Sequence, residues 1–124
     1  MFRPIIPIQL AWGDRELNAN YYRALVDSGA DWCLFHAEIG ELLGIPIRDG
    51  ERRSFVGIEG VENFAYFHWI RLIFGGMSNE IKAGFVEHFR FRYGILGQGG
   101  FFDHFVVTLS SLQPAPYVDI NRLH

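Results

Sequence analysis

The chain has 124 residues, a formal net charge of −3 and a pI near 5.9. This length predicts one domain, covering residues 1–124, without room for a second. Because acidic and basic residues are interspersed and the net charge is slightly negative, nucleic acid is a poor candidate partner.

The hydrophobic content and the single cysteine indicate a folded protein from a reducing compartment. Hydrophobic residues make up 49% of the chain and include 12 Phe, enough for a large core. Cys33 cannot form an internal disulfide by itself. The Met1–Pro7 segment is too short for a signal peptide, and no apolar run has membrane-spanning length. We therefore expect a cytoplasmic chain with no membrane partner, either whole or a domain of a longer protein.

The first part of the chain predicts a hairpin. We expect a first strand near Ile6–Trp12 and a second strand at Tyr21–Val26, separated by polar residues and by the turn signal Gly13–Asp14. Pro4 and Pro7 lack the N–H that a central strand must donate. They therefore place the first strand at the edge of the sheet.

An acid follows the second strand directly. Asp27, Ser28 and Gly29 come immediately after the apolar residues Ala24–Val26. Removing an ionised carboxylate from water costs several kcal/mol unless hydrogen bonds or a partner compensate it. A tight turn at Gly29 can direct backbone N–H groups and the Ser28 hydroxyl toward the Asp27 oxygens. Such a loop can hold an acid at the floor of a cleft, although Asp-Ser-Gly is also ordinary turn chemistry.

A short helix is predicted next. Apolar residues recur at helical spacing over Phe35–Leu43, with Gly44 as a stop signal and Pro46 just beyond it. Cys33 and His36 have a spacing that invites a thiol–imidazole interpretation. The surrounding residues do not supply the rest of a cysteine-protease site, so a buried cysteine near the start of a helix is favoured.

Glycines and aromatic residues organise the middle of the chain. Two glycines surround an apolar tip in Ser54–Gly60, which predicts a hairpin whose tip can flex. The alternation over Glu62–Phe74 predicts a long strand, followed by a turn at Gly75–Asn79 and a strand at Ile81–Val86.

Two histidines in this region do not form a metal motif. His68 and His88 are far apart and have no cysteine or second carboxylate at ligand spacing. We interpret them as hydrogen-bonded or solvent-facing residues. The sequence therefore predicts no metal and no other cofactor.

A second informative segment lies near the end of the chain. Gly94-Ile95-Leu96-Gly97 joins an apolar strand end to a glycine-rich stretch that reaches Phe105. Taken alone, this is a glycine-rich connector. A strand is expected at Phe105–Leu109 and another at Tyr117–Ile120, after a loop with two prolines. The last strand could lie at a subunit interface.

Taken in order, these segments resemble the retropepsin-like, or retroviral-type, single-domain aspartic proteases, as a bacterial-type member. The resemblance covers residues 5–110. It depends on the Asp-Ser-Gly triplet that begins at residue 27, the glycine-containing hairpin near residue 58 and the Ile-Leu-Gly segment at residues 95–97. It implies a mainly β fold with one or two short helices, built as a closed or partly open acid-protease barrel with one lobe per chain. Phe101 and Phe102 would form the core face of a short helix under the active site.

The resemblance also implies roles for individual residues in peptide hydrolysis. Asp27 would be the catalytic acid/base, and Ser28 and Gly29 would support its loop. The residues that would line or cover the groove for a polypeptide substrate are Ala30, Asp31, Gly57, Ile58, Glu59 and Gly60. Two carboxylates share one proton in this chemistry, and the chain has only one such triplet, so a homodimer is expected to supply the second Asp27.

Two residues depart from the family pattern. Glu59 interrupts the usual Gly/Ile tip of the flap hairpin, and Gln98 replaces the arginine that would pair with Asp31. An alternative is therefore a non-catalytic peptide-binding or dimerisation module with the same fold. A serine-nucleophile interpretation of Ser28 is disfavoured, because the sequence has no nucleophile elbow and no positioned base.

Overall fold

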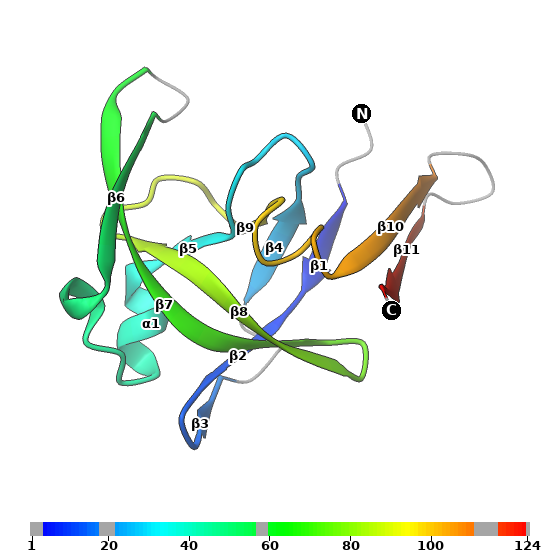
Figure 1. Ribbon diagram of the computed structural model, residues 1–124, viewed down its shortest axis with the longest axis horizontal. Coiled ribbons are helices and arrows are strands. Elements are labelled where there is room, and N and C mark those ends of the chain that lie inside the picture. Colours follow the sequence, from blue (N-terminus) through cyan, green and yellow to red (C-terminus); the bar gives the residue numbers. More distant parts are fainter. Residues whose placement is uncertain (1–3, 18–21, 57–59, 111–116, 124) are drawn as a thin grey trace.

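The structure is a computed structural model that describes residues 4–17, 22–56, 60–110 and 117–123. The described part is mostly strand, with one short α-helix (Figure 1). The strands are β1 (Ile5–Pro7), β2 (Gln9–Trp12), β3 (Arg15–Glu16), β4 (Arg23–Val26), β5 (Leu34–His36), β6 (Glu51–Val56), β7 (Glu62–Phe74), β8 (Met77–Val86), β9 (Gly94–Leu96), β10 (Phe105–Ser110) and β11 (Tyr117–Arg122). The helix is α1 (Ala37–Leu42), and a 3-10 turn, η2 (Ile47–Asp49), follows it.

Most of the strands belong to one curled, mixed sheet. Its order is β1-β4-β9-β5-β8-β7-β2-β3, and β6 pairs with β7 outside this path. The sheet curls into a half-barrel, so the expected mainly β, partly open barrel is confirmed. β10 and β11 form a separate two-stranded sheet beside it (Figure 1).

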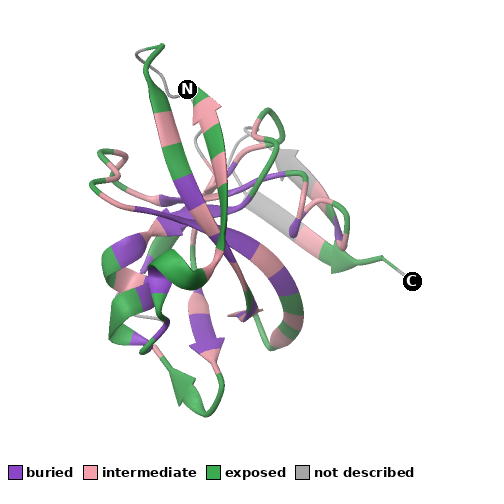
Figure 2. Ribbon diagram, turned by 60° about the vertical axis from the view of Figure 1, so that its left-hand side comes forward, coloured by how far each residue is buried: buried purple, intermediate pink, exposed green. Residues whose placement is uncertain are grey.

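Strand β7 contributes to two clusters of buried apolar residues in the described part of the chain, a main one that includes Ile70, Leu72 and Phe74 and a smaller one that includes Ala65 and Phe67. It has the predicted bounds, Glu62–Phe74, and pairs with β8 without interruption from Ala65 to Phe74. Its buried residues are Ala65 and Phe67 in one half but Ile70, Leu72 and Phe74 in the other, so the buried face changes near Trp69. Figure 2 shows buried segments gathered where the strands meet, with β3 exposed. Trp69, at the change of face, is 59% exposed.

Aromatic residues tie the C-terminal hairpin to the core. The ring of Phe105, the first residue of β10, lies 5.1 Å from that of Phe74 and 5.3 Å from that of Phe101, centroid to centroid. Arg122 of β11 donates a 2.9 Å hydrogen bond to the carbonyl of Ser78. Phe105 is buried in the main cluster, so the β10–β11 hairpin packs on the half-barrel.

The N-terminal strands differ from the prediction at their boundaries. The expected first strand is interrupted at Ile8, whose N–H donates to the carbonyl of Tyr22. This divides it into β1 and β2, which pair with different strands, β4 and β7. β1 does lie at the sheet edge, as its prolines predict. β4 begins at Arg23, and the turn at Gly13–Asp14 leads into β3, a short strand that the sequence did not predict.

The helix is shorter than its apolar spacing predicts. It begins at Ala37, because Phe35 lies in β5 and pairs in parallel with Phe85 of β8. Both rings are fully buried, and this long-range packing outweighs the local helical pattern. Gly44 has a φ of +83°, as expected for a glycine that ends a helix.

Two turns near β8 and β10 also differ from the prediction. Gly75 and Gly76, with φ of +52° and +78°, make a two-residue hairpin turn, so β8 begins at Met77 instead of after Asn79. The expected helix at Phe101–Phe102 is wrong. Residues 101–104 form a single turn before the chain enters β10. Phe101 is nevertheless fully buried.

No helix in the described ranges is long and apolar enough to cross a membrane.

Candidate active-site loop

The loop that carries Asp27 begins where β4 ends. β4 pairs in parallel with β9, and the N–H of Asp27 extends this pairing by donating a 2.9 Å hydrogen bond to the carbonyl of Leu96. Val26 and Leu96 are both buried beneath this point. The apolar strand therefore fixes the position of the acid's main chain, as the sequence predicts.

The Asp27 carboxylate is oriented by its own turn. Its Oδ1 accepts a 3.0 Å hydrogen bond from the N–H of Gly29, and its main-chain carbonyl accepts a 3.1 Å bond from Ala30. Among the described residues, none donates a hydrogen bond to Oδ2. Asp27 is half-buried, and Ser28 and Gly29 are exposed. The turn thus holds one carboxylate oxygen of Asp27 in place.

Residues from the far side of the sequence hold this loop. β9 lies between β4 and β5, the two strands that the loop connects (Figure 1). Gln98, just after β9, donates from its main-chain N–H to the carbonyl of Ala30 at 2.8 Å, and from its side-chain amide to the carbonyl of Ser28 at 2.7 Å. Gln98 therefore clamps both sides of the Ser28–Ala30 turn.

The next residue continues the contact along the chain. The N–H of Gly99 donates a 2.9 Å hydrogen bond to the carbonyl of Asp31, and the carbonyl of Gly99 accepts one of 3.3 Å from Cys33. A Cβ at Gly97 would overlap the carbonyl oxygen of Trp32 and lie 2.7 Å from that of Ala30. Glycine is therefore required at residue 97 because two backbones meet there.

Asp31 does not form the ion pair that the family pattern would give it. It is exposed, and within the described ranges its carboxylate takes part in no hydrogen bond or salt bridge. The side chain of Gln98, which stands where the family has the arginine of that pair, bonds to the carbonyl of Ser28 and not to Asp31.

The expected flap corresponds to the β6–β7 hairpin. Val56 pairs with Glu62 across it, and Gly60, with a φ of +73°, belongs to its turn. The exposed fractions of Val56 and Val61 are 73% and 58%, so the hairpin carries apolar side chains that the chain itself does not cover. The predicted flap residues Gly57, Ile58 and Glu59 lie outside the described residues.

The thiol and imidazole near the loop do not form a nucleophilic pair. Cys33 is fully buried, and burial raises the pKa of its thiol to about 12. His36 instead bonds to the Tyr22 hydroxyl through Nδ1 at 2.8 Å and to the carbonyl of Phe91 through Nε2. Burial also raises the pKa of the Tyr22 phenol above its ordinary value.

Sequence reasoning missed a pocket beside the loop. An open pocket of about 180 Å³ is lined by Trp32, Arg53, Phe67, Trp69, Ile81, Lys82, Gly99, Gly100, Asp103 and His104. The sequence contains no signal for it, because the exposure of Trp69 in β7 is known only from the structure. The other lining residues come from distant parts of the chain and share no motif.

The described residues contain no group of three or more His, Cys, Asp or Glu side chains placed to hold a metal ion. Comparison of the chain with protein-family models, with curated proteins and with solved structures gave no match. The functional inference therefore depends on the loop geometry and on the sequence motifs.

Proposed function

We propose that the chain is one half of a homodimeric aspartic endopeptidase of the retropepsin-like type. The observation that carries the proposal is the position of Asp27. Its main chain is fixed by a buried parallel strand, one carboxylate oxygen is held by the N–H of Gly29, and the residue is half-exposed. A general acid/base needs this combination of restraint and access.

The chemistry requires a second carboxylate. Two acids at hydrogen-bonding distance cannot both ionise, so one keeps a proton while the other activates a water for attack on a peptide carbonyl. The sequence has a single Asp-Ser-Gly. A two-fold axis next to the loop would bring Asp27 of a second copy opposite the first, because such an interface pairs each residue with its own copy.

The remaining roles follow from the same loop. Ser28 and Gly29 support the acid, and Ala30 and Asp31 line the groove for an extended polypeptide. The β6–β7 hairpin covers that polypeptide, and Gly57, Ile58, Glu59 and Gly60 are the residues proposed to contact it. The apolar side chains exposed on this hairpin suit contact with a bound chain.

The test uses Asp27→Asn, because asparagine keeps the Oδ1 acceptor for Gly29 while removing the acid. An unfolded, alkylated polypeptide is incubated at acidic and neutral pH, and the fragments are identified by mass spectrometry. We expect wild-type protein to give fragments that a statine-type inhibitor suppresses, and Asp27→Asn to give none. Asp14→Asn, which changes an exposed acid in the β2–β3 turn, is the matched control and should cleave normally.

Sedimentation equilibrium on both proteins measures the dimer separately. Cleavage that survives Asp27→Asn unchanged would contradict the proposal. If wild-type protein forms a dimer and binds the polypeptide but never cuts it, the function is instead the non-catalytic peptide-binding or dimerisation module with this fold.

A further inference from the structure

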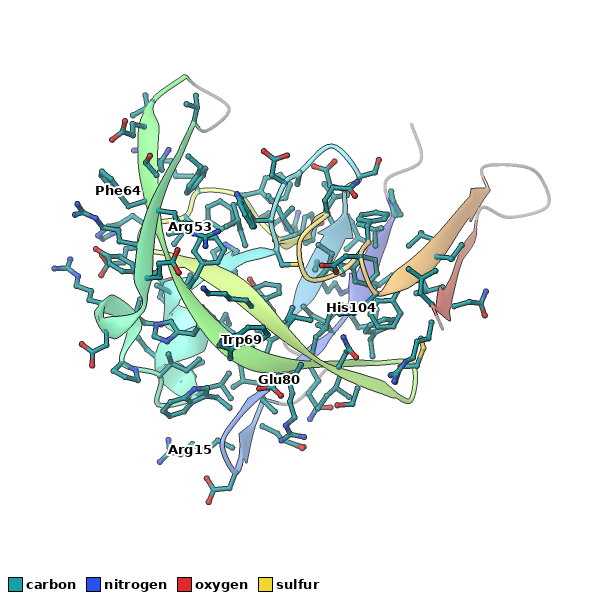
Figure 3. All side chains as sticks on the ribbon, viewed as in Figure 1. Arg15, Arg53, Phe64, Trp69, Glu80 and His104 are labelled. Atoms are coloured by element: carbon teal, nitrogen blue, oxygen red, sulfur yellow. The ribbon has the colours of Figure 1, made fainter. Side chains whose placement is uncertain are left out.

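We infer that the pocket beside the Asp27 loop is a binding site for a single-ring aromatic side chain, Phe or Tyr, of a bound polypeptide. The pocket lies between β6, β7 and β8 on one side and the Gly99–His104 segment on the other. Figure 3 labels three of its residues, Arg53, Trp69 and His104, which come from β6, β7 and the turn before β10. This inference deepens the proposed function and depends on it only for the choice of a polypeptide as ligand.

The walls of the pocket are aromatic rings partly open to solvent. Trp32 and Phe67 contact each other edge to face, with ring centroids 5.5 Å apart. Trp32 and Trp69 both line this pocket, and they are 38% and 59% exposed to solvent. Leaving two indoles in water forgoes the stabilisation that burial would give, which a ligand ring could recover.

The size of the pocket suits a single aromatic ring. A cavity of about 150 Å³ is known to accommodate benzene. The pocket has about 180 Å³ and is partly open to solvent, so it has room for a phenyl or phenol ring.

Cations at the rim favour an aromatic occupant over an aliphatic one. The guanidinium carbon of Arg53 lies 4.8 Å from the ring centroid of Trp32 and 5.0 Å from that of Phe67. Lys82 also lines the pocket, and both cations bond to Glu51, at 2.7 Å for Lys82 and 2.6 Å for Arg53. With Asp103, which also lines the pocket, the charges of Arg53, Lys82 and Glu51 sum to zero. The cations at this rim nevertheless favour the face of a π-system, which an aliphatic side chain does not offer.

The opposite rim connects the pocket to the Asp27 loop. Asp103 accepts a 3.0 Å hydrogen bond from the N–H of Gly100 and lies 3.6 Å from Nε2 of His104. Gly99, also in the lining, bonds to the main chain of Asp31 and Cys33. A side chain bound here would therefore belong to a polypeptide that passes the Asp31 side of the loop.

The test follows the indole N–H signals of ¹⁵N-labelled full-length protein by NMR. The chain has three tryptophans, Trp12, Trp32 and Trp69, and Trp12 lies in β2 outside the pocket. With N-acetyl-phenylalanine amide as the added compound, we expect saturable shifts of the Trp32 and Trp69 signals and a fixed Trp12 signal. N-acetyl-leucine amide should shift them at least several-fold more weakly.

Substitutions separate binding from folding. Trp69→Ala should weaken binding of N-acetyl-phenylalanine amide by several-fold to about tenfold, because it removes one aromatic wall of the pocket. Trp69→Phe should restore much of the affinity. Phe64→Ala is the matched control, because Phe64 is also an exposed aromatic residue of β7 with an arginine, Arg52, over its ring, but it does not line the pocket.

Three outcomes would overturn the inference. The pocket signals could stay fixed up to the solubility limit of the compound, or the leucine compound could bind equally well. The third outcome is that the Trp32 and Trp69 signals shift with protein concentration and no longer respond to the compound, which would mean that a second copy covers the pocket. None of these outcomes bears on cleavage, and a loss of cleavage in Asp27→Asn would not affect binding here. The two proposals can thus fail separately.

Discussion

The side-chain amide of Gln98 donates a 2.7 Å hydrogen bond to the carbonyl of Ser28, a residue 70 positions earlier in the chain. Together with the bond from the main-chain N–H of Gln98 to Ala30, it ties the acid-bearing turn to the end of β9. The stability of this turn therefore depends on a residue that belongs to neither the acid motif nor the strand before it.

Replacing Gln98 should loosen the turn. Gln98→Ala removes one exposed hydrogen bond and should lower the free energy of unfolding by about 0.5–1.5 kcal/mol. Gln98→Glu has the same shape but places a carboxylate oxygen against the Ser28 carbonyl, so we expect a larger loss. Urea unfolding measures the stability, and hydrogen exchange of the Gly29 and Ala30 amides measures the turn itself. If Gln98→Glu exchanged as slowly as wild type, the clamp described above would not exist.

Gly97→Ala should destabilise the protein more than Gly99→Ala. A methyl group at residue 97 meets two backbone carbonyls, of Trp32 and Ala30, that cannot move without shifting the whole loop. At residue 99 the nearest atoms are 3.0 Å away in the Trp32 side chain and 3.2 Å away at the Asp31 carbonyl, so small adjustments suffice. Overpacking of this kind costs about 1–3 kcal/mol, with Gly97→Ala at the upper end. Thermal unfolding of the two variants compares them, and equal losses would contradict the backbone contact.

Tyr22→Phe should cost about 1–3 kcal/mol of stability, because it leaves two polar groups of His36 without partners. The Tyr22 hydroxyl lies 2.8 Å from Nδ1 of His36 and accepts a 3.1 Å hydrogen bond from the His36 N–H. Nε2 contacts the carbonyl of Phe91, which can only accept, so in the neutral ring Nδ1 is the acceptor for the Tyr22 hydroxyl.

Urea unfolding of Tyr22→Phe checks this expectation. Tyr93→Phe is the control, since the described part of the chain gives the Tyr93 hydroxyl no hydrogen bond. Similar losses in the two variants would show that Tyr22 stabilises the protein through the packing of its ring and that its hydroxyl contributes little.

The ion pairs of Glu51 with Lys82 and Arg53 predict that part of the protein's stability is lost at acidic pH. Hydrogen bonds from Lys82, and then from Arg53, lower the pKa of Glu51 from 4.5 to about 2. Because the folded-state pKa is depressed, the contribution of Glu51 to stability is present above pH 4.5 and is lost as the pH falls toward 2. Glu51→Gln should therefore lose less stability than wild type over this interval.

Thermal unfolding at several pH values, with and without added salt, measures the effect. It should be small and should shrink in salt, because the groups are solvent-exposed. Glu62→Gln, at an exposed glutamate for which the described residues provide no ion pair, should follow the wild-type pH profile. A Glu51→Gln profile that also matched wild type would contradict this assignment.

The sequence alone identified the features that depend on neighbouring residues. The alternation and the flanking turn residues placed β7 at Glu62–Phe74 with the bounds that the structure has. The apolar run before Asp27 predicted a strand that ends at the acid, and Ile95-Leu96-Gly97 predicted a second strand end. These signals are local, because side-chain periodicity and glycine turns act over a few residues.

Only the tertiary structure decided which distant segments meet. Four features depend on strand pairing or packing between segments far apart in sequence. They are the break at Ile8, the strand conformation of Phe35, the hydrogen bond from Gln98 to Ser28, and the pocket that Trp32 and Trp69 help to line. The free energy of such contacts comes from burying apolar surface and pairing backbone groups across the sheet. A local pattern carries no information about the partner that will supply them.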